Sequence, residues 1–189
     1  MRRKPLRLKE FDYSTAGLYF ITICAYDRQC LLGSILNDSV ELSAVGEMVK
    51  KWWYKLPVKF AGIKIDESII MPNHLHGIVN IIGGNPCLAS KSPSNIVGGD
   101  PCVAPKSFPP GKDLNPSLPR LIQWFKTMST NEYLRYIKTA KLPSAQSKLW
   151  QRNYYEHVIR NEQELYEIRK YIIENPLKWS LDPENPLIK

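Results

Sequence analysis

Two of the three histidines in the chain stand one residue apart, as His74 and His76 on either side of Leu75. The run that follows is rich in β-branched residues and predicts a strand. Side chains alternate between the two faces of a strand, so both imidazoles should point to one face while Leu75 points to the other. Two imidazoles that converge in this way supply half of a site for a divalent metal ion. The same pattern is compatible with two surface histidines that make structural hydrogen bonds.

Three tyrosines are candidates for a nucleophile. Tyr154 and Tyr155 lie beside His157, which could act as a base, but their segment predicts a strand in which one member of the pair faces inward. Tyr171 lies one helical turn before Asn175 on the same face of a predicted helix. This spacing lets one helix present a phenol and a carboxamide oxygen to the same ion. An ordinary packing tyrosine on an amphipathic helix would have the same spacing.

The composition favours a basic protein with a polyanionic partner. Lys and Arg number 26 against 18 acidic residues, which gives a formal net charge of +8. Each phosphate neutralised by Lys or Arg releases condensed counterions, so nucleic acid is a natural partner; a soluble basic protein without such a partner has the same composition. The four cysteines form no CxxC pair, and no secretory signal or bilayer-length apolar run is present. We therefore expect a soluble cytoplasmic protein with reduced thiols.

The elements that must position these residues can be assigned from hydrophobic periodicity and from helix caps and breakers. Ser43 and Asn161 are well placed as the N-caps of two helices. Pro57 should end the first of these helices and Pro176 the second. The expected order is a strand at 17–26, a helix at 43–55, strands at 62–71 and 75–82, a helix at 117–137, a strand at 153–159 and a helix at 162–175. The first six elements match an α+β, ferredoxin-like split βαβ fold, an antiparallel sheet with helices on one face. The last helix is additional.

Residues 83–117 interrupt this pattern. They are dense in Gly, Pro and Ser, and the stretch that begins at Gly83 is echoed by a similar one that begins at Gly98. Cys87 and Cys102 match between the two copies, but two lone cysteines lack the other ligands of a metal site. We expect one domain over residues 1–189 that carries a flexible surface insertion here, without a catalytic role.

Several blocks of the chain resemble the REP-associated tyrosine transposases, a branch of the single-tyrosine HUH transposases. The segment Met71-Pro-Asn-His-Leu-His-Gly-Ile-Val79 is similar to the HUH motif, in which two histidines flank a hydrophobic residue. Arg2-Arg3, the stretch from Asp12 to Thr22, the stretch from Leu149 to His157 and the stretch from Tyr171 to Pro176 resemble further blocks of that family. The similarity covers nearly all of the chain outside the insertion, and several matches in the same order are much more specific than a lone HxH.

The resemblance implies a metal-dependent endonuclease and strand transferase that cleaves single-stranded DNA at or near a hairpin of the repetitive extragenic palindrome type. It implies Tyr171 as the nucleophile that forms a 5′-phosphotyrosine, with the last helix as its carrier. It also implies Mg²⁺ or Mn²⁺ bound by His74, His76 and Asn175. Some relatives have Gln at the position of Asn175. Both a monomer and a homodimer occur among the resembling proteins.

Other residues are candidates for DNA contacts. Arg2, Arg3, Lys4 and Arg7 form a basic arm that could follow phosphates or reach into a groove, or that could be a solvated terminus. Trp150 and Arg152 could shape the DNA path, although Trp150 could equally anchor the core, and His157 could have a structural role. Two other functions remain open: a non-catalytic nucleic-acid-binding protein on a ferredoxin-like sheet, and a phosphodiesterase that activates water.

Overall fold

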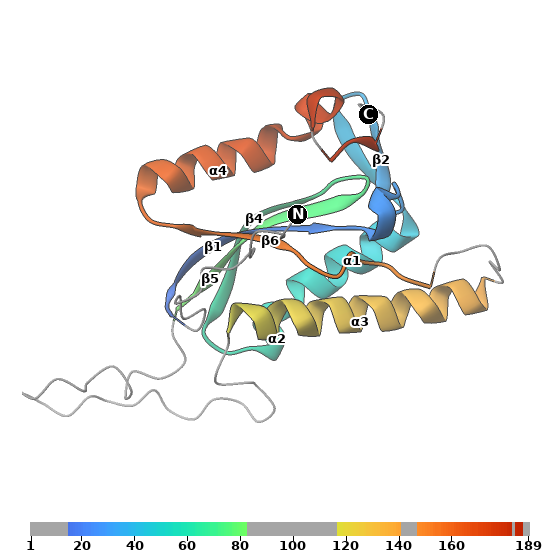
Figure 1. Cartoon of the computed structure of the whole chain (residues 1–189), viewed down its shortest axis with the longest axis horizontal. Helices are drawn as coiled ribbons and strands as arrows, with labels where there is room; N and C mark the ends of the chain where they lie inside the picture. Colours follow the sequence, from blue (N-terminus) through green and yellow to red (C-terminus); the bar gives the residue numbers. More distant parts are fainter. Residues whose placement is uncertain (1–14, 83–116, 141–146, 183, 187–189) are drawn as a thin grey trace, which may run out of the picture.

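The computed structural model describes residues 15–82, 117–140, 147–182 and 184–186. Its centre is a four-stranded antiparallel sheet with the strand order β4-β5-β1-β6. The sheet is covered on one side by α4 and on the other by α1 and α3 (Figure 1). The strands are β1 (Gly17–Cys24), β4 (Ile63–Ile70), β5 (His74–Ile81) and β6 (Tyr155–Ile159), and the main helices are α1 (Ala44–Tyr54), α3 (Leu118–Thr139) and α4 (Glu162–Glu174). This arrangement confirms the α+β, split βαβ fold, with α4 as the additional helix on the opposite face.

The predicted caps explain where the helices begin. The Ser43 hydroxyl accepts a hydrogen bond from the Gly46 amide, and the Asn161 carboxamide oxygen accepts one from the Glu164 amide. The Glu164 carboxylate in turn accepts a hydrogen bond from the Arg160 amide. These side chains satisfy amides that the first helical turn leaves without partners.

None of the described helices is both long and apolar enough to cross a membrane.

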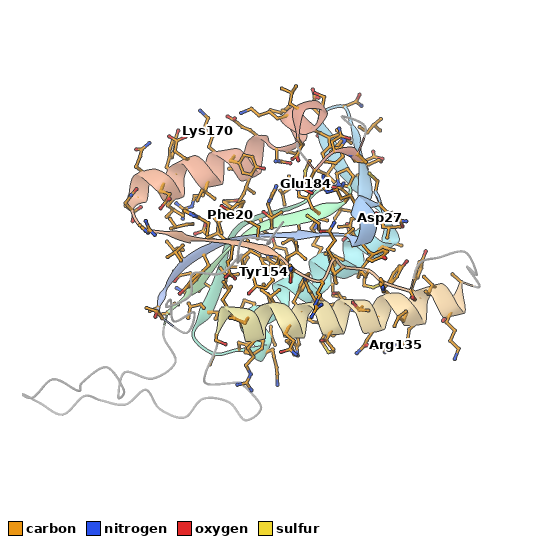
Figure 2. All side chains as sticks on the ribbon, in the orientation of Figure 1. Phe20, Asp27, Arg135, Tyr154, Lys170 and Glu184 are labelled. Carbon is orange, nitrogen blue, oxygen red and sulfur yellow. The ribbon has the colours of Figure 1, made fainter. Side chains whose placement is uncertain are left out.

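The sheet separates two hydrophobic clusters. The larger lies between the sheet and helices α1 and α3, and the smaller lies beneath α4. Successive residues of a strand enter different clusters: Tyr19 and Ile21 lie in the larger and Phe20 in the smaller. Figure 2 shows the same division, with Phe20 on the side of α4 and Tyr154 toward α3. The face beneath α4 is the one that carries the candidate site.

The structure adds one element and changes one local prediction. The turn at Asn37 and Asp38 joins two short strands, β2 (Gly33–Leu36) and β3 (Ser39–Leu42), which form a separate hairpin that the sequence analysis did not include. Asn37 and Asp38 both have positive φ, as a type I′ turn requires. Pro57 does not simply end the helix, because it lies in the first turn of the short helix α2 (Leu56–Lys59), where its missing N–H has no cost. After α4, the chain continues into the 3₁₀ helix η2 (Pro176–Leu181).

The basic arm at residues 2–7 and almost all of the predicted insertion at 83–117, with Cys87 and Cys102, lie outside the described residues.

Candidate active site

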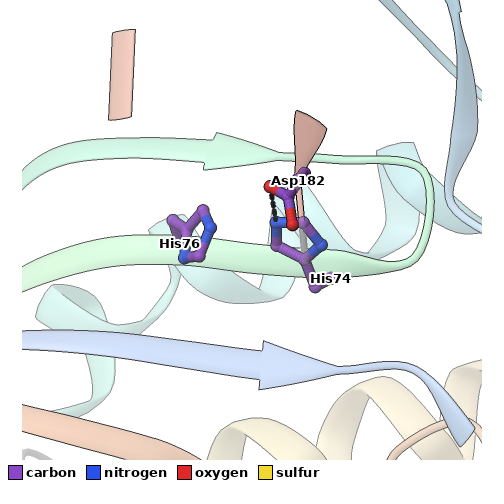
Figure 3. Close-up of side chains that lie close together, drawn as sticks. All are labelled: His74, His76 and Asp182. Atoms are coloured by element: carbon purple, nitrogen blue, oxygen red, sulfur yellow. Dashed lines mark ion pairs between the residues drawn. The ribbon is translucent and has the colours of Figure 1, made fainter. Parts of the chain in front are cut away.

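Strand β5 brings His74 and His76 to the same face of the sheet, as strand alternation predicts. Both side chains are buried, and their ring centroids lie 4.3 Å apart. Asp182, directly after η2, reaches the same place, and one ligand atom from each of the three residues lies within 4.8 Å of the others. Figure 3 shows the two imidazoles on β5 and the Asp182 carboxylate beside His74. This buried His-His-Asp group can bind a metal ion.

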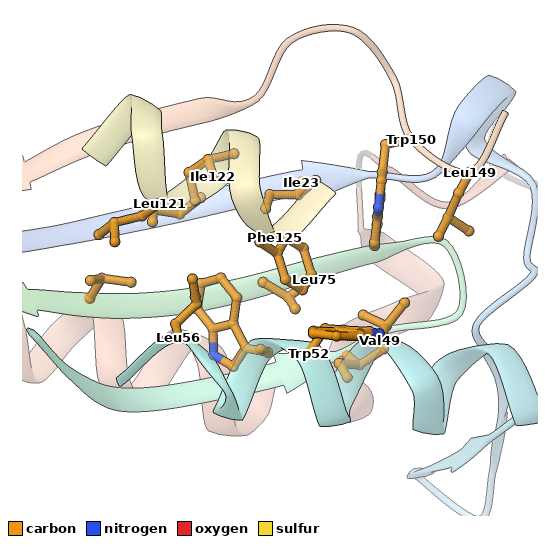
Figure 4. Packing of buried hydrophobic residues seen from close by; sticks show 14 of the residues in the cluster. Ile23, Val49, Trp52, Leu56, Leu75, Leu121, Ile122, Phe125, Leu149 and Trp150 are labelled. Atoms are coloured by element: carbon orange, nitrogen blue, oxygen red, sulfur yellow. The ribbon is translucent and has the colours of Figure 1, made fainter. Parts of the chain in front are cut away.

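The opposite face of β5 holds the strand in position. Leu75 lies in the larger cluster with Ile23 of β1 and Phe125 of α3 (Figure 4). At Gly77, an added Cβ atom would come within 2.4 Å of the Trp53 ring, so only hydrogen fits there. Because a shift of one residue would reverse every side chain, this packing also determines which face carries the histidines.

Asn73 determines the tautomer of His74. The Asn73 carboxamide nitrogen donates to the main-chain oxygens of Arg28 and Glu184, at 3.1 and 2.7 Å. Its oxygen must therefore be the atom that lies 2.8 Å from His74 Nδ1, and this oxygen accepts the Nδ1–H hydrogen bond. The proton is thus on Nδ1, and Nε2 carries a free lone pair that faces the Asp182 carboxylate at 3.9 Å. Such a partner on the distal nitrogen is typical of metal-binding histidines.

His76 has a comparable support. Its Nδ1 lies 2.8 Å from the hydroxyl of Thr22 on the neighbouring strand β1, and its ring stacks on Phe20 at 5.4 Å. Binding of a metal through Nε2 requires the tautomer in which Nδ1–H donates to Thr22. The two histidines therefore each have one nitrogen held by the protein and the other directed into the site.

Burial keeps both imidazoles neutral. Desolvation lowers the pKa of His74 to about 4, against an opposing attraction from Asp182. Desolvation, and then the charge of His74, lower the pKa of His76 well below its ordinary value. Neutral imidazoles are the form that binds metal ions.

Three buried acceptor atoms in this region have no hydrogen-bond partner among the described residues: His74 Nε2, Asp182 Oδ2 and Asn175 Oδ1. Asn175 is 2% exposed and follows Tyr171 by one helical turn. A buried acceptor without a hydrogen-bond donor costs the folded protein about 1–3 kcal/mol of stability. A second acceptor beside it cannot remove this cost. A cation would satisfy all of them, so this donor set fits a divalent metal ion.

Helix α4 places Tyr171 over the histidines. Leu165 and Ile172 pack into the smaller cluster, and the Arg169 guanidinium binds the Asp66 carboxylate on β4 through two hydrogen bonds of 2.8 and 2.7 Å. The Tyr171 hydroxyl lies 3.1 Å from His76 Nε2. Burial, and then the charge of Asp182, raise the pKa of Tyr171, while a hydrogen bond from Asn175 opposes the rise. The phenol is therefore next to the candidate metal ligands, and its raised pKa favours the protonated form.

The adjacent tyrosines divide between the two faces, as expected for a strand. Tyr154 is half-buried against the larger cluster, with the Lys126 ammonium 5.6 Å from its ring. Tyr155 lies on the face of the histidines, 51% exposed, and its ring centroid is 6.3 Å from that of Phe20. The structure thus brings Tyr171, and not Tyr155 or Tyr154, into hydrogen-bond contact with a histidine of the site.

The remaining sequence candidates have different surroundings. Trp150 is 8% exposed and its indole N–H donates to the Ser129 hydroxyl, which favours the core role over a DNA contact. His157 lies 2.6 Å from the Glu164 carboxylate and links β6 to α4, in keeping with a structural role. Arg152 is exposed on the rim of a groove of about 420 Å³ to which Lys126 and Lys148 also contribute.

Asp182 was missed by the sequence analysis, as were the supporting residues Thr22 and Asn73. Asn73 precedes the first histidine directly, so its position was a usable signal. Asp182 lies in an irregular segment after a 3₁₀ helix, where no periodicity indicates the direction of a side chain. Only the turn of the chain back across the sheet brings it to the histidines.

Comparisons with known proteins agree with this fold. No family model matches the chain. An uncharacterized protein of Haemophilus influenzae is 37% identical over 180 residues, which cover 95% of this chain and 91% of that protein. The solved structure of a REP-associated tyrosine transposase bound to a REP hairpin superposes with a TM-score of 0.55 at 16% identity, over 93% of this chain and 75% of the other. The chain therefore belongs to the same family as the Haemophilus influenzae protein and has the fold of a REP-associated tyrosine transposase.

Proposed function

We propose that the protein is a transposase-class enzyme that cuts and rejoins single-stranded DNA through Tyr171 with the help of a divalent metal ion. One observation carries the proposal: the Tyr171 hydroxyl lies 3.1 Å from His76 Nε2, the same nitrogen that faces the metal-binding group. Buried acceptor atoms without partners lie beside this tyrosine, and a tyrosine with only a structural role would not explain them. A nucleophile that attacks a metal-bound phosphate needs this proximity.

The ion would be Mg²⁺ or Mn²⁺, held by His74, His76 and Asp182 with Asn175 as a further oxygen ligand. Two imidazole nitrogens and two oxygens suit a divalent ion of this kind, and Asp182 adds a negative charge that the sequence analysis did not include. When bound, the ion would polarise the phosphate oxygens and favour the ionised phenol.

The reaction of the chain's own residues follows from the position of Tyr171. The phenol loses its proton, and its oxygen forms a bond to phosphorus while the bond between phosphorus and the 3′ oxygen breaks. The leaving 3′ oxygen takes up one proton, which balances the proton lost by the phenol, so the products are a 5′-phosphate linked to Tyr171 and a free 3′-hydroxyl. A 3′-hydroxyl can attack the phosphotyrosine in the reverse direction, so strands are rejoined without ATP.

The proposed substrate is a single strand that carries a hairpin. The net charge of +8 favours a polyanion, and the REP-associated transposase of similar fold was solved with a REP hairpin. We assign Arg152 to the path of the DNA backbone, because it is exposed on the same groove as Lys148. The basic arm Arg2, Arg3, Lys4 and Arg7 stays a prediction from the sequence.

A covalent-adduct assay tests the proposal. Hairpin-bearing single strands from the DNA that flanks the gene are incubated with the protein and Mn²⁺ or Mg²⁺, and denaturing gels are used to detect protein linked to a 5′ end. The wild type should form the adduct, EDTA should prevent it, and Tyr171→Phe should abolish it while DNA binding persists. Tyr154→Phe and Tyr155→Phe are matched controls that should retain it.

The other outcomes identify the competing functions. Cleavage that continues in Tyr171→Phe, with no protein on the product, would indicate a phosphodiesterase that activates water. Binding without cleavage in either metal, across a broad set of hairpins, would indicate a nucleic-acid-binding protein without catalytic activity.

A further inference from the structure

A row of aromatic rings leads from the metal-binding group to the exposed edge of the sheet. Phe20 lies in the middle of this row. Its ring stacks on His76 at 5.4 Å, and its ring centroid is 6.1 Å from that of Tyr171 and 6.3 Å from that of Tyr155. Exposure rises along the row, from 3% at His76 and 8% at Phe20 to 51% at Tyr155. Tyr155 is thus the outermost and most exposed ring in a series of aromatic contacts that begins at His76.

The strand register places Tyr155 close to the chemistry. Thr22 of β1 pairs with His76 on one side and with Tyr155 on the other, so the three residues lie in one row across the sheet. Neighbouring strands are about 4.8 Å apart, which puts the Tyr155 backbone roughly 10 Å from that of His76. Tyr155 is therefore one strand beyond Thr22 and two strands from the histidine of the candidate site.

A contribution to the stability of the fold does not by itself explain the exposed position of Tyr155. Its hydroxyl makes no hydrogen bond with another residue of the described chain, and half of its surface faces solvent. Its neighbour Tyr154, by contrast, packs against the larger cluster. A tyrosine whose ring lies open beside a buried polar site offers one flat apolar face to a ligand.

We propose that Tyr155 forms a stacking subsite, with Phe20 at its base, for one unpaired nucleobase next to the phosphate that Tyr171 attacks. An unpaired base exposes a π-face that an aromatic side chain can stack on, and such stacking tolerates any base. Duplex DNA has no free face to offer, so this subsite selects single strands. RNA-recognition domains use aromatic residues on a similar four-stranded sheet in the same way. The inference rests on the proposed function for the identity of the phosphate.

Fluorescence of 2-aminopurine tests the subsite without requiring cleavage. The probe is a hairpin-bearing single strand from the DNA flanking the gene, with 2-aminopurine moved one position at a time along its unpaired segment, and the protein carries Tyr171→Phe so that the DNA stays intact. One position should be quenched on binding. Adding Tyr155→Ala should remove that quenching and weaken binding about 5- to 150-fold. Adding Tyr155→Phe should preserve both within about twofold, because the hydroxyl has no part in stacking.

Two controls separate stacking from damage to the fold. Tyr166→Ala removes a tyrosine of α4 that is 60% exposed, and it should leave quenching and affinity unchanged. Tyr155→Leu keeps an apolar side chain on β6 and should retain the thermal stability but lose the quenching. Equal binding by Tyr155→Ala and the parent, or quenching that survives this substitution, would overturn the subsite. Quenching that depends on Tyr155 in a wild-type protein that forms no adduct would support the subsite and refute the proposed function.

Discussion

The hydroxyl of Tyr171 on α4 lies 3.1 Å from Nε2 of His76 on β5, although the two positions are 95 apart in the chain. The contact joins the outer helix to the strand that it covers, and the Arg169–Asp66 pair fastens the same helix to β4. Tyr171 therefore approaches the histidines from the helix side, whereas Thr22 and Asn73 hold their other nitrogens from the sheet side. The site is assembled between these two layers.

Asp182→Asn should weaken metal binding without destabilising the fold. The substitution keeps the oxygen that accepts a hydrogen bond from the Glu184 amide. It also puts an amide donor where Oδ2 now lies 3.9 Å from His74 Nε2, which relieves an unpartnered acceptor. We expect the free energy of unfolding of the metal-free protein to stay level or rise by about 1 kcal/mol, and Mn²⁺ affinity to fall at least about tenfold.

Titration calorimetry with Mn²⁺ and thermal unfolding with and without the ion measure both effects. Glu184→Gln is the matched control, because it neutralises a nearby carboxylate that pairs with Arg28 and lies outside the His-His-Asp group. An unchanged metal-induced increase in Tm for Asp182→Asn would remove Asp182 from the ligand set.

Thr22→Val should lower metal affinity through His76. Valine has nearly the shape of threonine but cannot accept the Nδ1–H hydrogen bond that the Thr22 hydroxyl can accept at 2.8 Å. Loss of such a partner typically reduces metal affinity about 10- to 100-fold. Thr22→Ser, which keeps the hydroxyl, should recover most of it in the same titration. Equal affinities for the two variants would mean that Thr22 does not orient the imidazole.

The metal-free protein should lose stability as the pH falls below about 6.5. The unfolded chain takes up protons on His74 and His76 near their ordinary pKa of about 6.5. The folded chain resists this, because burial lowers the pKa of His74 to about 4 and that of His76 well below its usual range. Between those values the unfolded state binds more protons, so the free energy of unfolding should fall by up to about 1.4 kcal/mol per pH unit for each histidine.

Urea unfolding in EDTA at several pH values from 7.5 to 4.5 checks this dependence. His74→Gln removes one of the two titrating groups and should flatten the slope by roughly half. A wild-type slope that is already flat in this range would show that the histidines are not held neutral in the folded protein.

Gly77→Ala should destabilise the fold by overpacking. The added methyl group would meet the Trp53 ring at 2.4 Å on the core side of β5, and both groups lie in regular structure with little room to move. Overpacking of this kind costs about 1–3 kcal/mol. Gly17→Ala on β1 is the control, since its methyl group would have an ordinary contact of 3.8 Å. Urea unfolding should show a lower midpoint for Gly77→Ala alone.

Local patterns predicted the parts of the site that depend on short-range geometry. Alternation on a strand was enough to put His74 and His76 on one face, and the caps Ser43 and Asn161 were enough to place the starts of α1 and α4. The short hairpin β2–β3 was missed, because its strands have only four residues each and are largely exposed. Such strands carry little hydrophobic pattern.

Local sequence patterns therefore predict the paired histidines, the strand that carries them and the helix with Tyr171 and Asn175. Two features become visible only in the folded protein: α4 packs on the histidine face and not with α1 and α3, and Asp182 returns to His74 from the end of η2. The physical reason is that hydrogen bonds within helices and along strands are set by nearby residues. The contacts of Asp182 with His74 and of Tyr171 with His76 depend on how apolar faces pack across the sheet. No short segment of the sequence encodes this packing.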